Sequence, residues 1–202
     1  NIDGDITTIA ADDLAGYSIQ SFIFIRSNNK NYLMFNETGD NDGHITRVLN
    51  LNTCEFSSNT DFDPYPSFPG YDSIAYNPRR MMLSHLIYTV STLEVSSMYE
   101  FTANESFKDL NSSYEILSSL TFTSKIALQA DVISDNGEAL ERIDISAGTT
   151  FYPYATDSNS YTDYKLDDGR TVRLPMGYDD DHGHTINGIP VGDVFDGVVY
   201  AG

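Results

Sequence analysis

Short runs of alternating apolar and polar residues recur along the chain and end at Gly, Asn, Asp or Pro. The run YSIQSFIFI at 17–25 is followed by polar NNKN at 28–31 and apolar YLMF at 32–35. This pattern predicts two strands joined by a polar turn. The stretch HITRVLNL at 44–51 alternates in the same way and predicts a third strand.

Strand-like segments return after residue 79, in RRMMLSHLIYTV and STLEVSSMYEF, and again at 119–134. Asn136-Gly137 between two such segments is a strong hairpin signal, and DDGR at 167–170 predicts another turn. Short strands between Gly and Asp turns are typical of a small antiparallel barrel. We therefore predict an all-β protein, with an antiparallel, blade-like strand meander in residues 1–112 and a small β-barrel in residues 113–202.

Composition supports strands and excludes some partners. The 202 residues include 14 Tyr and 11 Phe, aromatic residues that suit a half-buried pleated surface. The formal net charge is -19, so we expect no binding to nucleic acid or to anionic lipid. Most of the acids are Asp, which predicts many turns and leaves Ca²⁺ sites as the alternative.

The single cysteine, Cys54, excludes an internal disulfide and zinc sites that need two thiolates. A lone Cys is more often a buried small residue than a nucleophile, so we expect burial. No apolar run is long enough to span a bilayer, so we expect no direct membrane insertion of these residues. The chain opens on Asn1 rather than Met, which is compatible with a removed leader or anchor.

Candidate metal ligands occur in two acidic stretches. GYDDDHGH at 177–184 offers Asp181, His182 and His184, which suit a zinc site or a metal-dependent hydrolase. Its flanking glycines and its run of Asp favour a solvated turn instead. Asp40 and Asp42 match part of a calcium loop, but two important ligand positions hold Thr38 and Leu49. We therefore expect no cofactor, with Ca²⁺ or Zn²⁺ as the minority alternative.

Loop and strand aromatics are the candidate ligand-binding residues. The proline-rich stretch 57–78 contains Tyr65, Phe68 and Tyr71, which either pin the loop to the body or form an exposed platform. The predicted barrel adds Tyr152, Tyr154 and Tyr161. Alternate residues of TTFYPY are expected to face the core. Motifs for a serine hydrolase, a nucleotide-binding loop, a CxxC pair or an HExxH metalloprotease are absent from the sequence.

Two long stretches carry a resemblance. ISAGTTFYPYATDSNSYTDYKLDDGRTVRL with INGIPVGDVFDGVVYAG resembles the C-terminal SH3-like module of secreted or lipid-anchored proteins from Gram-positive gut bacteria. SFIFIRSNNKNYLMFNETGDNDGHITRVLNLN with NPRRMMLSHLIYTVS is similar to their strand-rich half. The resemblance implies an SH3-like barrel, an extracytoplasmic address and a non-enzymatic body, and it transfers no catalytic residue.

These observations predict a non-catalytic, cell-surface recognition or accessory protein whose ligand is a glycan, a peptide or a protein. It would act outside the cell or anchored to the envelope. The alternatives are a hydrolase built on the Asp181, His182 and His184 loop, and a purely structural envelope subunit.

Overall fold

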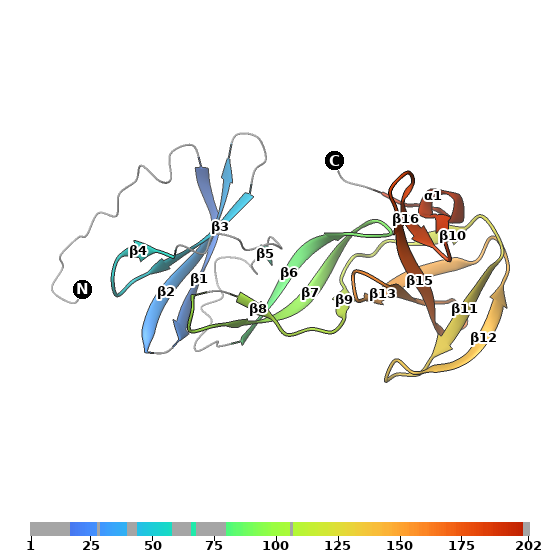
Figure 1. The fold of residues 1–202 in the computed structure, drawn as a ribbon, viewed down its shortest axis with the longest axis horizontal. Helices are drawn as coiled ribbons and strands as arrows, with labels where there is room; N and C mark the ends of the chain where they lie inside the picture. The colour runs from blue at the N-terminus through green and yellow to red at the C-terminus, as the bar shows by residue number, and fades with distance from the viewer. Residues whose placement is uncertain are drawn as a thin grey trace. The chain divides into compact units, whose positions relative to one another are not determined.

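The computed structural model describes residues 17–27, 29–39, 44–57, 66–67, 80–105 and 107–199 (Figure 1). Side chains are described at 24–26, 29–34, 47–57, 86–105 and 108–199. Apart from the single turn of helix α1 (Val191–Val194), the regular elements of these residues are strands, and all of their pairings with described registers are antiparallel. The predicted all-β class is confirmed. The described part of the chain contains no helix that is long and apolar enough to cross a membrane.

The chain forms two compact units. The first comprises residues 1–84 and 98–110, and the second comprises residues 85–97 and 111–202. Their bounds divide two strands, β6 (Arg80–Tyr88) and β7 (Thr92–Phe101). Segment 85–97, which the sequence-based division places in residues 1–112, therefore packs in the second unit. The division of the chain into domains stays a prediction.

The first unit contains a four-stranded antiparallel meander in the order β1-β2-β3-β4. Its strands are β1 (Tyr17–Ser27), β2 (Lys30–Gly39), β3 (His44–Asn50) and β4 (Glu55–Phe56). Ser27 pairs with Lys30, so the predicted hairpin is present but its turn is shorter than the polar run 28–31. The unit also contains β5 (Pro66–Ser67) and β8 (Phe107–Asp109), and β8 pairs with β7.

A partly buried polar cluster in this unit is centred on Glu105, whose side chain is 25% exposed. Tyr32 stacks edge-on against Phe101, with ring centroids 4.8 Å apart. The Glu105 carboxylate accepts hydrogen bonds from the Tyr32 hydroxyl and the Asn50 amide, each at 3.2 Å.

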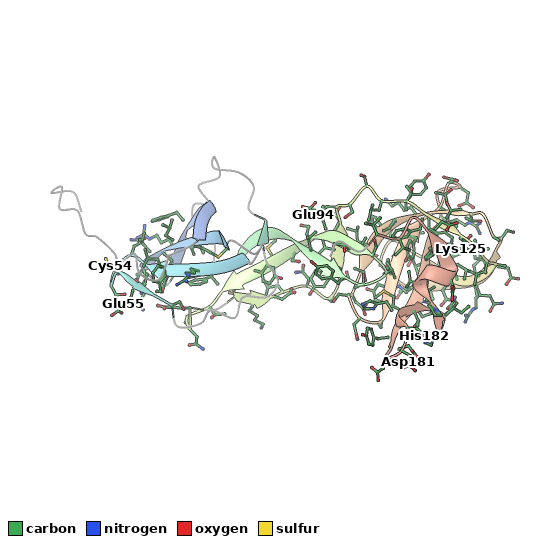
Figure 2. The ribbon with its side chains drawn as sticks, turned by 90° about the horizontal axis from the view of Figure 1, so that it is seen from above. Cys54, Glu55, Glu94, Lys125, Asp181 and His182 are labelled. Carbon is green, nitrogen blue, oxygen red and sulfur yellow. The ribbon has the colours of Figure 1, made fainter. Side chains whose placement is uncertain are left out.

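Cys54 is exposed, at a positive φ of 58°, in the turn before β4 (Figure 2). The expectation that this cysteine is buried is wrong, because the turn places it outside the alternation that buries strand residues.

The second unit is built on a sheet whose strand path runs β12-β11-β15-β14-β13-β9-β7-β6. Off this path, β10 pairs β13 and β18, and β16 pairs β15 and β17. The added elements are β9 (Tyr114–Ile116), β10 (Phe122–Ser124), β11 (Leu128–Ile133), β12 (Ala139–Ile145), β13 (Thr150–Thr156), β14 (Tyr161–Lys165), β15 (Thr171–Asp179), β16 (Gly183–Ile186), β17 (Ile189–Pro190) and β18 (Phe195–Asp196). Among these described strands the path does not return to its edge strand β12.

Strand alternation sends one face of this sheet into an aromatic core. Phe122, Phe151, Tyr164 and Phe195 are each at most 1% exposed, and their ring centroids lie 5.1–6.3 Å apart. Aromatic pairs at such separations add stability beyond the area that they bury. On the opposite face of β13 and β14, Tyr152 and Tyr154 are exposed, whereas Asp163 is buried.

Three tight turns order the hairpins of this unit. Gly137 and Gly169 adopt positive φ values of 81° and 87°, which confirms the turns predicted from DNGE and DDGR. Asn187 and Gly188 join β16 to β17 with φ values of 53° and 77°. Two consecutive positive values define a primed hairpin turn, for which Asn-Gly is the preferred pair. Asn187-Gly188 is thus a second Asn-Gly hairpin turn of this unit.

Candidate functional site

A polar groove of about 730 Å³ opens on the solvent face of the second unit's sheet. Its floor is formed by side chains of β13, β14 and β15. One wall is the segment 112–115, and the other is the turn region 133–137 between β11 and β12. Its volume lies within the range usual for small-molecule sites.

The floor residues point outward because β13 alternates and then bulges. Phe151 and Pro153 are buried, whereas Tyr152 and Tyr154 are 39% and 42% exposed. The pairing of β13 with β14 shifts between Pro153 and Ala155, which leaves Tyr154 as the extra residue of a β-bulge. Bulges re-aim side chains and are common beside functional sites. Tyr154 keeps the outward direction that alternation from Tyr152 gives it, and it belongs to the groove lining.

A row of charged residues crosses the sheet through the groove floor. On β14 and β15, Asp163 pairs with Arg173, and on β11 Asp131 also pairs with Arg173. Beyond Asp131, Arg142 on β12 continues the row, with its Nε 4.0 Å from the Asp131 carboxylate. Opposite charges on neighbouring strands stabilise a sheet. The row therefore alternates in sign across four strands.

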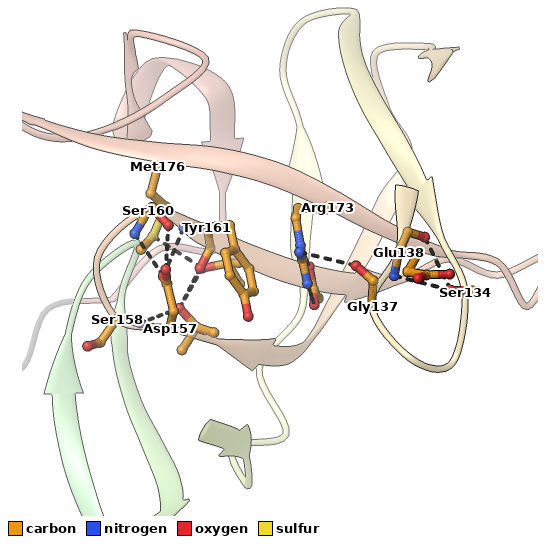
Figure 3. Close-up of polar contacts among 12 residues, drawn as sticks. Ser134, Gly137, Glu138, Asp157, Ser158, Ser160, Tyr161, Arg173 and Met176 are labelled. Carbon is orange, nitrogen blue, oxygen red and sulfur yellow. Dashed lines mark hydrogen bonds and ion pairs between the residues drawn. The ribbon is translucent and has the colours of Figure 1, made fainter. Parts of the chain in front are cut away.

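Arg173 joins the floor of the groove to its wall. Its Nε and Nη2 donate to the two carboxylate oxygens of Asp163 at 2.6 and 2.8 Å. Its Nη1 donates to the Gly137 carbonyl at 3.4 Å, and its guanidinium lies 3.6 Å from the centroid of the Tyr161 ring (Figure 3). The bond with Asp163 raises the pKa of Arg173, and the nearby Asp163 charge adds to this effect against the cost of burial. Asp163 is 4% exposed, and the two bonds from Arg173 satisfy both of its carboxylate oxygens.

The turn before β14 fixes the backbone at Tyr161 (Figure 3). The Asp157 carboxylate accepts hydrogen bonds from the backbone N–H groups of Asn159, Ser160 and Tyr161. Burial alone would raise the pKa of Asp157, but these bonds and the Ser160 hydroxyl lower it overall. The backbone N–H of Tyr161 is thereby fixed at the start of the strand.

Each tyrosine ring of the floor carries a cation. Arg173 covers Tyr161, and the Lys165 ammonium lies 4.0 Å from the centroid of the Tyr154 ring. Tyr152 lies beside the groove rather than in its lining, and its hydroxyl donates to Asp167 at 2.9 Å. That hydrogen bond to a carboxylate raises the pKa of Tyr152. Tyr152, Tyr154 and Tyr161, the aromatic residues predicted in this unit, are thus on the solvent face of the sheet.

The other predicted aromatic residues, Tyr65, Phe68 and Tyr71, lie outside the described residues. Asp40 and Asp42 also lie outside them.

The stretch 177–184 forms a hairpin with an exposed turn at 180–182 (Figure 2). Asp179 ends β15, and its carboxylate accepts from the N–H groups of Asp181 and His182 and contacts the His182 Nδ1 at 2.8 Å. The contact with His182 is the main cause that lowers the pKa of Asp179. His184 instead packs edge-on against Tyr178, with ring centroids 5.2 Å apart.

The predicted exposed turn in this stretch is present, although the strands extend closer to it than expected. Where side chains are described, no three His, Cys, Asp or Glu residues are grouped as metal ligands. Asp181 and His182 both contact the Asp179 carboxylate, Asp181 only through its backbone N–H, whereas His184 packs against Tyr178; this arrangement gives no geometric support to a hydrolase site.

Sequence reasoning missed the charged half of the groove. Asp163, Lys165 and Arg173 alternate with buried Thr162, Tyr164 and Val172, so their outward direction was readable from strand alternation. The position of the wall at 133–137 beside these residues could not be predicted, because it depends on which strand pairs with β15. Pairing β11 with β15 skips three strands of the sequence.

No protein-family model, curated protein or solved structure matches the chain.

Proposed function

We propose that the protein is a non-catalytic recognition or accessory protein that binds a glycan or a peptide in the groove of its second unit. The observation that supports this most directly is the pair Tyr154 and Tyr161 on the floor of a polar groove. Tyrosine offers a rigid apolar face with a polar tip, so it binds ligands that are partly apolar and partly hydrogen-bonding.

The environment of the charged side chains favours binding over catalysis. A catalytic acid or base must be within reach of a substrate proton and free to exchange one. Both carboxylate oxygens of Asp163 already accept from Arg173. Glu115 and Asp135, the other carboxylates of the groove, lie on opposite walls. The groove offers hydrogen-bonding groups and ring faces on a fixed sheet.

The resemblance noted in the sequence extends the proposal. The second unit is SH3-like, and the protein is secreted or lipid-anchored and works at the bacterial cell envelope. Its acidic charge would disfavour teichoic acid and nucleic acid as partners. A glycan, peptide or protein of the cell surface is the proposed partner, and no cofactor is required.

The test is a binding panel on the full chain by isothermal titration calorimetry. Its members are neutral oligosaccharides (cello-, xylo-, manno- and chito-), oligogalacturonate, and proline-rich peptides, each measured with and without EDTA. For each member of the panel that binds the wild type, Tyr154→Ala should weaken the affinity at least tenfold. Tyr178→Ala is the matched control, since Tyr178 is 68% exposed on β15 and lies outside the groove lining. Binding that survives Tyr154→Ala unchanged would reject the groove as the site.

A further inference from the structure

The two tyrosine rings of the groove differ in how firmly their cations are held. Arg173 over Tyr161 is fixed by two bonds to Asp163 and one to the Gly137 carbonyl. Moving Arg173 would leave the buried Asp163 carboxylate without its partner, which is costly. The face of Tyr161 under Arg173 is therefore part of the fixed structure.

Lys165 over Tyr154 has no such anchor. Within the described part of the chain, its ammonium makes no ion pair, and its contact is with the Tyr154 ring at 4.0 Å. Lys125 of the same unit is different, since its Nζ donates to the Gly192 carbonyl at 2.7 Å and lies 3.2 Å from Asp196. A lysine that is held by one exposed cation–π contact leaves its ring at small cost, because such contacts are weak in water.

The lining of the groove disfavours two of the possible ligand classes. Its aliphatic side chains are limited to Ile133, which is 8% exposed, and the small Ala155, so a peptide finds no deep apolar pocket for an anchor. An acidic glycan meets the carboxylates of Glu115 and Asp135 on the two walls, in a chain of net charge -19. Arg173 is already bound to Asp163, and apart from this pair and Lys165 the remaining lining offers mainly hydroxyl groups and the Asn136 amide, which match uncharged sugars.

We propose that the ligand of this groove is an uncharged glycan, and that Lys165 occupies, in the free protein, the face of Tyr154 on which a sugar ring stacks. This inference rests on the proposed function and specifies its ligand class. Tyr154 suits this role because it is the bulged residue of β13 and is 42% exposed. Lys165 then competes with the sugar for the same ring face.

The competition predicts the sign of a substitution. Lys165→Gln removes the competing cation and the free protein no longer has to release it, so neutral glycans should bind more tightly. An exposed cation–π contact corresponds to a roughly two- to fivefold change in affinity. Lys165→Arg keeps a cation over the ring and should not tighten binding. A ligand that carries a carboxylate would respond in the opposite direction, because Lys165 would be its partner.

The experiment measures the dissociation constants of wild type, Lys165→Gln, Lys165→Arg and Lys125→Gln for the neutral oligosaccharides and for oligogalacturonate. Lys125→Gln is the matched control for loss of one positive charge outside the groove lining. Circular dichroism and the melting temperature establish that each variant is folded. We expect tighter neutral-glycan binding in Lys165→Gln alone.

Three results would overturn the inference and leave the proposed function standing. They are unchanged neutral-glycan binding in Lys165→Gln, equal tightening in Lys125→Gln, and binding of oligogalacturonate or a peptide that Lys165→Gln weakens. A different result, in which neither wild type nor Lys165→Gln binds any member of the panel, would reject the proposed function itself.

Discussion

Arg173→Met tests whether one ion pair holds the groove together. The substitution keeps an unbranched side chain that still packs on Tyr161, and it removes the guanidinium that binds Asp163. The Asp163 side chain left behind is 6% exposed, while the Arg173 side chain is 27% exposed. Breaking a buried pair by removing one partner costs about 3–5 kcal/mol of unfolding free energy. Because water reaches part of the Arg173 side chain, we expect the low end, about 3 kcal/mol.

The double variant separates the worth of the pair from the penalty of the orphaned charge. Asp163→Asn combined with Arg173→Met removes both charges, so no buried carboxylate is left unpaired. Replacing both partners of a buried pair is often close to neutral. We therefore expect the double variant to be more stable than Arg173→Met alone by about 1 kcal/mol or more.

The assay is urea unfolding of the full chain, followed by circular dichroism and by tyrosine fluorescence. Two compact units can unfold in separate transitions, so the transition that Arg173→Met shifts is the one assigned to the second unit. Arg142→Met is the control, because its contact with Asp131 is 4.0 Å long and exposed, and such pairs contribute about 0–1 kcal/mol. A loss below about 1 kcal/mol in Arg173→Met, or a double variant that is no more stable than Arg173→Met, would refute the reasoning.

Three further predictions concern a turn, an acid and a metal. Gly197→Ala should destabilise the protein by about 2 kcal/mol or more in urea unfolding, because φ at Gly197 is +89° and a Cβ there would lie 2.6 Å from the Thr121 carbonyl oxygen. The control Gly192→Ala, which has open space around the added Cβ, should change the unfolding free energy by less than about 0.5 kcal/mol. Because the pKa of Asp157 is lowered in the folded protein, its contribution to stability is present above its ordinary pKa of 3.8 and is lost as the pH falls through the lower folded value. The difference in unfolding free energy between wild type and Asp157→Asn should therefore shrink at acid pH, and a difference that stays constant from pH 7 to pH 2 would contradict this prediction. Excess Zn²⁺ or Ca²⁺ should leave the melting temperature unchanged, whereas a bound ion at a hundred times its Kd would add about 2.7 kcal/mol to the unfolding free energy. A Zn²⁺-induced rise in melting temperature that is lost when the histidines in 182–184 are replaced by Ala would establish a metal site there.

Strand alternation and turn chemistry made much of the second unit predictable. Asn136-Gly137 and Asp168-Gly169 mark hairpin turns because Gly adopts positive φ without strain, and both turns are present. The outward direction of Tyr152 and Tyr154 also follows from local sequence, once Phe151 is assigned to the core. These features depend on neighbours in sequence, so a single chain suffices to infer them.

The groove itself depends on pairings between distant segments. Arg173 reaches Gly137 because β15 lies beside β11, and Glu115 becomes a wall because β9 pairs with β13. No local pattern specifies which strand lies beside which, because the hydrophobic period of a strand is the same for every partner. The sequence therefore directed attention to GYDDDHGH, where charged residues are adjacent in the chain. The charged residues that the fold brings together, Asp163 and Arg173, are separated by a hairpin and look unremarkable in the sequence. For an antiparallel sheet protein of this kind, a candidate site is better sought in outward-facing residues at register partners than in runs of adjacent polar residues.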